Sequence, residues 1–135
     1  MEVAAACIAF AQAADKTISI IRAFIIDCRH ARSDLSAVNR ELSELKLTLN
    51  ILRDLVPDGS KTRDPLPSSI RDDIRSIIRN CLDVAKEIDD VLLEHRGRFA
   101  AVNWATKGKQ KINSLNSVLE AHRRALNLAV DTITL

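Results

Sequence analysis

The chain has 135 residues, a length that suits one domain with a hydrophobic core. Hydrophobic residues make up 47% and charged residues 28%, which is typical of a globular protein and not of a disordered one. Three glycines, three prolines, no tyrosine and 3% aromatic residues disfavour a β-sandwich or β-barrel, and a net charge of +2 does not by itself indicate a nucleic-acid partner.

The N-terminal segment, residues 3–26, is the most apolar part of the chain. Between residues 3 and 14 only Gln12 is polar, so we expect other helices or lipid to cover this segment on all sides. Its apolar residues recur in steps of three and four, which predicts a helix with one core-facing stripe. The stripe is Val3, Cys7, Phe10, Ala14, Ile18, Ile21, Ile25 and Cys28.

Polar residues interrupt this apolar segment. Asp15, Lys16 and Thr17 are compatible with a bend, so residues 2–29 fit either one helix or two. Asp15, Lys16 and Arg22 also keep every uncharged run below the roughly 18 residues that a membrane span needs. The start of the chain lacks the basic residues of a signal peptide. We therefore expect a soluble, intracellular domain, which forms the N-terminal part of a longer protein.

The second segment has the clearest helical pattern. Its core stripe is Leu35, Val38, Leu42, Leu45, Leu49, Leu52 and Val56. A flanking row widens the apolar face and predicts contacts with two neighbours: Leu47, Ile51 and Leu55. Ser33 is the expected N-cap, and the prolines between residues 57 and 67 predict the one long loop.

The third segment begins at Ser68 or Ser69, either of which is a suitable N-cap, and Gly97 is its expected terminator. Its stripe is Ile70, Ile74, Ile77, Cys81, Val84, Ile88 and Val91, with Ile78, Leu82, Ala85 and Leu92 alongside. Its carboxylates are expected to lie on a solvated face rather than in a catalytic or cation-binding cleft: Asp83, Glu87, Asp89, Asp90 and Glu94.

The fourth segment covers about residues 102–133. Its stripe is Ile112, Leu115, Leu119, His122, Leu126, Ala129 and Ile133. Four amphipathic segments joined by one long and two short connections predict an all-α four-helix bundle that spans residues 1–135 as a single domain.

No group of residues supports enzymatic chemistry. His30 and His95 end helical segments, and His122 is expected to be a hydrogen-bonded core residue rather than a metal ligand. Cys7, Cys28 and Cys81 are odd in number and widely spaced, which predicts buried free thiols in a reducing compartment. We therefore expect no catalytic residues, metal site or cofactor.

Basic residues gather between the third and fourth segments. Residues 70–95 have four basic and seven acidic side chains, whereas residues 96–135 have seven basic and two acidic ones. Five of these seven form a cluster, which we call the basic cluster: Arg96, Arg98, Lys107, Lys109 and Lys111. These residues are either solvated, or paired with the acidic third helix, or a patch for anionic lipid. Trp104, within the cluster, is either a core plug or an interfacial anchor.

Four stretches together resemble a fungal HeLo-like N-terminal domain over essentially the whole chain. They are EVAAACIAFAQAADKTISIIRAF, SELKLTLNILRDL, LPSSIRDDIRSIIRNCLDVAKEIDDVL and NWATKGKQKINSLNSVLEAHRRALNLAV. The most specific residues of the resemblance lie in the last stretch: Trp104, Gly108, Lys109, Leu119, Glu120 and Arg123.

This family stands at the front of fungal NLR-type receptors, and its fold is similar to the four-helix bundle of the necroptosis pseudokinase and to plant resistance coiled-coil domains. The resemblance implies a cytoplasmic domain that oligomerises, moves to the plasma membrane and causes cell death. It implies anionic lipid, other copies of the chain and downstream receptor domains as partners, with no nucleic acid and no small-molecule substrate. The inserting segment would comprise Val3, Cys7, Ile8, Phe10, Ile18, Ile21, Phe24 and Ile25.

The length of the apolar segment limits spontaneous insertion. Residues 3–14 form about 18 Å of helix, less than the ~30 Å hydrocarbon core of a bilayer. Extension to residue 26 adds Asp15, Lys16 and Arg22, each of which costs roughly 2.5–3.5 kcal/mol at the middle of a bilayer. A soluble monomer that inserts only when many copies align is therefore one hypothesis. A non-lytic adaptor that makes protein contacts is the other.

Overall fold

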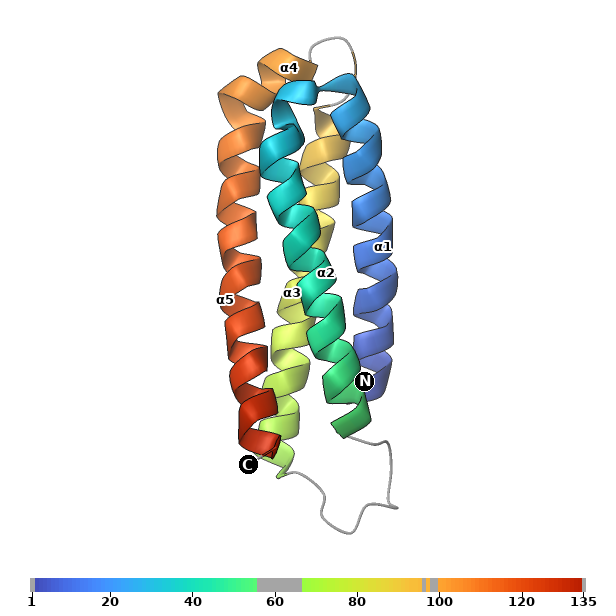
Figure 1. The fold of residues 1–135 in the computed structure, drawn as a ribbon, viewed down its shortest axis with the longest axis vertical. Helices are drawn as coiled ribbons and strands as arrows, with labels where there is room; N and C mark the ends of the chain where they lie inside the picture. Colours follow the sequence, from blue (N-terminus) through green and yellow to red (C-terminus); the bar gives the residue numbers. More distant parts are fainter. Residues whose placement is uncertain (1, 56–66, 96, 98–99, 135) are drawn as a thin grey trace.

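The computed structural model is an all-α four-helix bundle, described for residues 2–55, 67–95, 97 and 100–134 (Figure 1). No strand occurs within those ranges. The predicted loop at residues 57–66, together with Val56, Arg96 and Arg98, lies outside the described residues. The elements are α1 (Val3–Asp27), the 3₁₀ turn η1 (Arg29–Ala31), α2 (Arg32–Leu55), α3 (Ser68–Glu94), α4 (Ala100–Asn103), the π-helical turn η2 (Trp104–Gly108) and α5 (Lys109–Thr134).

The four long helices occupy the corners of the bundle in the order α1, α2, α5, α3. Both α1 and α5 pack against α2 and against α3. The helices α1 and α3 run away from the end that holds both termini, and α2 and α5 run back toward it (Figure 1). Consecutive helices α2 and α3 therefore stand at opposite corners, which explains why the sequence provides a longer connection there than between α1 and α2.

The helix α1 is continuous over 25 residues, with no break at residues 15–17. Its buried stripe follows a strict seven-residue repeat: Val3, Cys7, Phe10, Ala14, Thr17, Ile21, Phe24 and Cys28. The predicted stripe is correct except at Ile18 and Ile25, which are only half-buried because Thr17 and Phe24 take the core positions. A polar threonine fits this position because its hydroxyl has a hydrogen-bond partner in α3.

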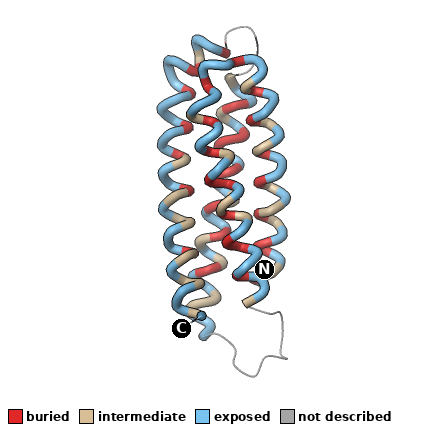
Figure 2. Tube along the Cα trace, in the orientation of Figure 1, coloured by how far each residue is buried: buried red, intermediate tan, exposed pale blue. Residues whose placement is uncertain are grey.

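The expectation that α1 is covered on all sides is wrong. Ile8 is 46% exposed, and Ala5 and Ile26 also face solvent. Each helix of a four-helix bundle contacts two neighbours and leaves its outer side open, as the alternating burial along every helix shows (Figure 2).

The core stripe of α2 is confirmed at every described position: Leu35, Val38, Leu42, Leu45, Leu49 and Leu52. Of the flanking row, Leu55 is half-buried against the core, whereas Leu47 is 64% exposed and Ile51 is 50% exposed. The helix meets α1 and α5 through residues on either side of its core stripe, so the side that carries Leu47 remains in solvent.

The serine caps that the sequence suggests are not formed. The turn η1 leads directly into α2 at Arg32, which places Ser33 inside the first turn of that helix. Pro67 occupies the N-cap position of α3, and Ser68 is the first helical residue. By contrast, Gly97 lies just beyond the end of α3 with φ at +98°, a left-handed conformation that favours glycine, as the sequence predicts.

The helices α3 and α5 bury the expected sides. In α3 the buried residues are Ile74, Ile78, Cys81, Val84, Ala85, Ile88, Asp89 and Leu92, and Ile70, Ile77 and Val91 are half-buried. In α5 the buried residues are Ile112, Leu115, Leu119 and Leu126, whereas His122, Ala129 and Ile133 of the predicted stripe are only half-buried. All three cysteines are buried and free, as predicted.

Trp104 closes the end of the bundle where α4 and η2 lie. The side chain is 2% exposed, and its ring centroid lies 5.7 Å from that of Phe24 in a tilted arrangement. A Cβ atom at Gly108 would lie 3.0 Å from Trp104 Cε3, so the absence of a side chain there allows the indole to pack. Trp104 is therefore a core plug in this structure and not an interfacial anchor.

Two leucines on α2 test this arrangement with the same substitution. Leu45→Ala is expected to lower the free energy of unfolding by about 2–5 kcal/mol, because it opens a cavity at a fully buried position. Leu47→Ala, two residues along, is expected to change it by less than about 0.5 kcal/mol. Urea denaturation measures both, and equal losses would contradict the exposure of Leu47.

Candidate functional site

The helix α1 is the one helix within the described ranges that is long and apolar enough to cross a membrane by length and composition. A core helix of a soluble protein can have the same composition. The contacts of α1 with the other helices therefore matter for whether it could leave the bundle. The residues predicted to insert lie on two sides of this helix. Val3, Cys7, Phe10, Ile21 and Phe24 are buried, Ile18 and Ile25 are half-buried, and Ile8 is exposed.

One buried hydrogen bond connects α1 to α3. Thr17 Oγ1 donates to Asp89 Oδ1 at 2.7 Å, and Asp89 is only 7% exposed. The expectation that Asp89 belongs to a solvated acidic face is therefore wrong, although Asp83, Glu87, Asp90 and Glu94 are exposed as expected. The sequence could not separate Asp89 from its acidic neighbours because its partner is 72 residues away.

Burial raises the pKa of Asp89 above its ordinary value. The hydrogen bond from Thr17 and the charge of Lys16 oppose this shift, and the negative charge of Asp90 adds to it. The ionised carboxylate is thus held in an unfavourable environment, with one donor from α1 to offset the loss of water.

The polar contact between α1 and α2 is exposed. Lys46 Nζ lies 2.5 Å from Asp15 Oδ1, and the aspartate side chain is 64% exposed. Exposed ion pairs contribute up to about 1 kcal/mol. This pair therefore adds little to what holds α1 in the bundle, compared with the packing of its buried stripe.

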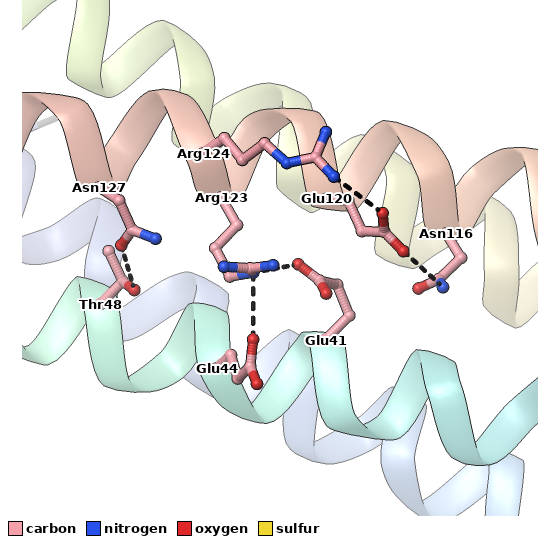
Figure 3. Close-up of polar contacts among 8 residues, drawn as sticks. All are labelled: Glu41, Glu44, Thr48, Asn116, Glu120, Arg123, Arg124 and Asn127. Atoms are coloured by element: carbon pink, nitrogen blue, oxygen red, sulfur yellow. Dashed lines mark hydrogen bonds and ion pairs between the residues drawn. The ribbon is translucent and has the colours of Figure 1, made fainter.

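A denser polar network joins α2 to α5 (Figure 3). Arg123 Nε donates a hydrogen bond to the buried Glu41 and lies 3.2 Å from Glu44 Oε2. This contact with Glu41 is the main cause that raises the pKa of Arg123. One turn away, Thr48 Oγ1 donates to Asn127 Oδ1 at 3.0 Å. The contact between Arg123 and Glu41 joins two charged groups that are partly buried, which makes it stronger than a surface pair.

The residues that carry the family resemblance have structural positions in the bundle. Leu119 is buried in the core, and Glu120 lies 3.4 Å from both Asn116 Nδ2 and Arg124 Nη2 on the side of α5 that bears Arg123. Trp104 and Gly108 form the end plug. Lys109 alone among the six is exposed without a packing role.

The lysines of the basic cluster are exposed at the end of the bundle opposite the N-terminus (Figure 1). Lys111 Nζ lies 3.8 Å from Glu87 Oε2, so part of the cluster pairs with the acidic third helix, as one interpretation predicts. Lys107 and Lys109 form no ion pair within the described part of the chain. Arg96 and Arg98 lie outside it.

The remaining titratable groups offer little chemistry. His122 is half-buried, and burial lowers its pKa, so the imidazole is held neutral. Burial raises the pKa of Cys81 to about 12, which keeps this thiol unreactive. Within residues 2–55, 67–95, 97 and 100–134, no three His, Cys, Asp or Glu side chains are placed to hold a metal ion.

No family model matches this chain, and no curated protein or solved structure shows significant similarity to it. The likeness to HeLo-like domains therefore depends on the residues quoted above.

Replacing Thr17 by valine tests the buried hydrogen bond. At neutral pH, Thr17→Val is expected to cost about 1–3 kcal/mol of unfolding free energy, because the ionised Asp89 loses its donor. The folded-state pKa of Asp89 is raised, so the folded protein binds this proton at a higher pH than the unfolded chain does, and its contribution to stability improves as the pH falls. The cost of Thr17→Val should therefore shrink in mild acid.

The matched control is Thr132→Val, at an exposed position whose hydroxyl bonds only to the Leu128 carbonyl of its own helix. Denaturant unfolding at neutral and mildly acidic pH compares the two variants. A cost at Thr17 that does not depend on pH would show that Asp89 is not the group involved.

Proposed function

We propose that this bundle is a membrane-perturbing domain in which α1 leaves the core and enters lipid when several copies are brought together. The observation that carries the proposal is the contrast between α1 and the other helices. The helix α1 is the apolar one, and its contacts with the other helices include a buried hydrogen bond to α3 and an exposed ion pair with α2. The pair of α2 and α5 is held by a charged network in addition to its packing.

The charges of α1 explain why clustering would be needed. Asp15, Lys16 and Arg22 are exposed in the bundle, so they cost nothing in water. Each would cost roughly 2.5–3.5 kcal/mol near the middle of a bilayer, which outweighs the gain from a few isoleucines. In an assembly these side chains can pair with one another or line a water-filled lumen. A single copy should therefore remain folded and soluble.

The HeLo-like resemblance supports a more specific form of this proposal. On that basis the domain is the death-inducing front end of a fungal immune receptor, cytoplasmic at rest and active at the plasma membrane after its downstream domains have oligomerised.

A non-lytic adaptor is the second candidate, and one surface feature favours it. Leu47 and Ile51 lie one turn apart on α2. Leu47 is 64% exposed and Ile51 is 50% exposed, and no helix of the bundle covers them. Exposed leucine and isoleucine at helical spacing suit a contact with another protein. Such a domain would associate without harming a bilayer.

Release of a dye from vesicles that contain phosphatidylserine separates the two candidates. The monomer and the same chain fused to a trimeric coiled coil are compared at equal chain concentration. We expect strong leakage from the trimer and little from the monomer. Absence of leakage from the trimer would favour the adaptor.

Ile8→Glu links leakage to α1 without disturbing the fold. Ile8 is exposed in the bundle, so the substitution should change the unfolding free energy by less than about 0.5 kcal/mol. A charge in an inserted helix should reduce leakage on the order of tenfold or more. Val118→Glu, at an exposed position on α5, is the matched control and should leave leakage unchanged. Equal leakage from both variants would mean that α1 does not insert.

A further inference from the structure

We propose that Arg71, Arg75 and Arg79 of α3 form a site for the phosphate headgroups of anionic lipid, at the end of the bundle where α1 begins. The proposal deepens the proposed function, since it names the end of the molecule that meets the bilayer. The three arginines recur every four residues, which places them along one side of the helix.

This side of α3 lies beside the start of α1. Arg75 and Arg79 line a small surface pocket together with Leu82 and with Ala6 of α1. Ala6 is buried and is the fourth residue of α1, so the pocket lies about one turn from the N-terminus of that helix. Two guanidinium groups thus border an apolar floor at the junction of the two helices.

The three arginines differ in how far acidic side chains neutralise them. Arg75 forms an ion pair with Asp72. Arg79 is exposed and forms no ion pair in the described part of the chain. Arg71 Nε is buried and has no hydrogen-bond partner among the described residues. The positive charge of the exposed Arg79 therefore remains available for an anion.

The chemistry of this site suits a lipid phosphate. Guanidinium groups bind phosphate with paired N–H donors, and several of them can share one headgroup or bind two neighbouring ones. The apolar surface of Ala6 and Leu82 between them can contact the glycerol and the upper part of an acyl chain. A free phosphate ion would gain nothing from that apolar floor.

The position of the site separates it from the basic cluster. The helix α1 has 25 residues, so the two ends of the bundle are about 37 Å apart. Lysines 107, 109 and 111 lie at the far end, and Lys111 is partly neutralised by Glu87. Docking through the arginines presents the apolar N-terminus of α1 to the bilayer, whereas docking through the lysines directs it away.

Co-sedimentation of the monomeric chain with phosphatidylserine vesicles tests the site. The double variant Arg71→Gln/Arg79→Gln should bind about 25-fold more weakly than wild type, at about fivefold per charge removed. The matched control Lys107→Gln/Lys109→Gln should lose less than about twofold. Helical circular dichroism verifies that each variant is folded. A greater loss in the lysine variant, equal losses, or no binding by wild type would overturn the proposal.

The single tryptophan reports the orientation independently. Trp104 lies at the lysine end, so its emission should not be quenched when wild type binds vesicles that contain brominated lipid. In a Trp104→Phe background, the indole introduced by Ser68→Trp at the arginine end should be quenched. The reverse result would overturn the inference. The leakage assay tests the proposed function, and the co-sedimentation assay tests the arginine site. Leakage from the trimer without any effect of the arginine substitutions would refute the arginine site alone.

Discussion

Packing of the α1 stripe between α2 and α3 is the interaction on which the rest of this bundle depends. The stripe repeats every seven residues from Val3 to Cys28, and nearly all of its side chains are small or aliphatic or aromatic. Its outer side is also poor in charge near the N-terminus, which an ordinary surface helix would not be. In water, α1 is therefore stable only when it is packed in the bundle. Its uncharged part, residues 3–14, would also be stable in lipid.

The polar contacts between α2 and α5 differ in kind from the hydrogen bond between α1 and α3. Arg123, with Glu41 and Glu44, joins α2 to α5 through groups whose separation would leave charge poorly solvated. The contact between Thr17 and Asp89 differs in this respect. The Asp89 carboxylate is poorly solvated while α1 is in place, and it would regain water if α1 left. Departure of α1 would break the hydrogen bond from Thr17 and the exposed Asp15–Lys46 pair, and it would return Asp89 to solvent. If α1 is released as we propose, these contacts favour a state in which α2 and α5 remain together.

Much of this fold could be predicted from residue spacing, and the failures have physical causes. The stripes of α2 and α5 were identified because every core position there is apolar or nearly so. Thr17 was missed in α1 because a polar residue at a core position breaks the pattern unless its partner, here Asp89, is known. The expectation that Leu47 contacts a neighbouring helix is wrong, because periodicity cannot tell a second buried row from an exposed one.

The candidate site was less accessible to sequence reasoning. Sequence clustering drew attention to the lysines between the third and fourth segments, which the fold places far from the start of α1. The four-residue spacing of the α3 arginines predicts one side of a helix, but aspartates are mixed with them and the sequence does not show what lies beside that side. Only the parallel arrangement of α1 and α3 brings them beside Ala6.

Hydrogen exchange measured by mass spectrometry on the clustered trimer, with and without phosphatidylserine vesicles, tests the release of α1 most directly. The account predicts that peptides from Thr17 and from α3 around Asp89 exchange faster on vesicles, while peptides from α2 and α5 around Glu41 and Arg123 keep their protection. Unchanged protection at Thr17 during leakage, or equal loss of protection in all four helices, would contradict it.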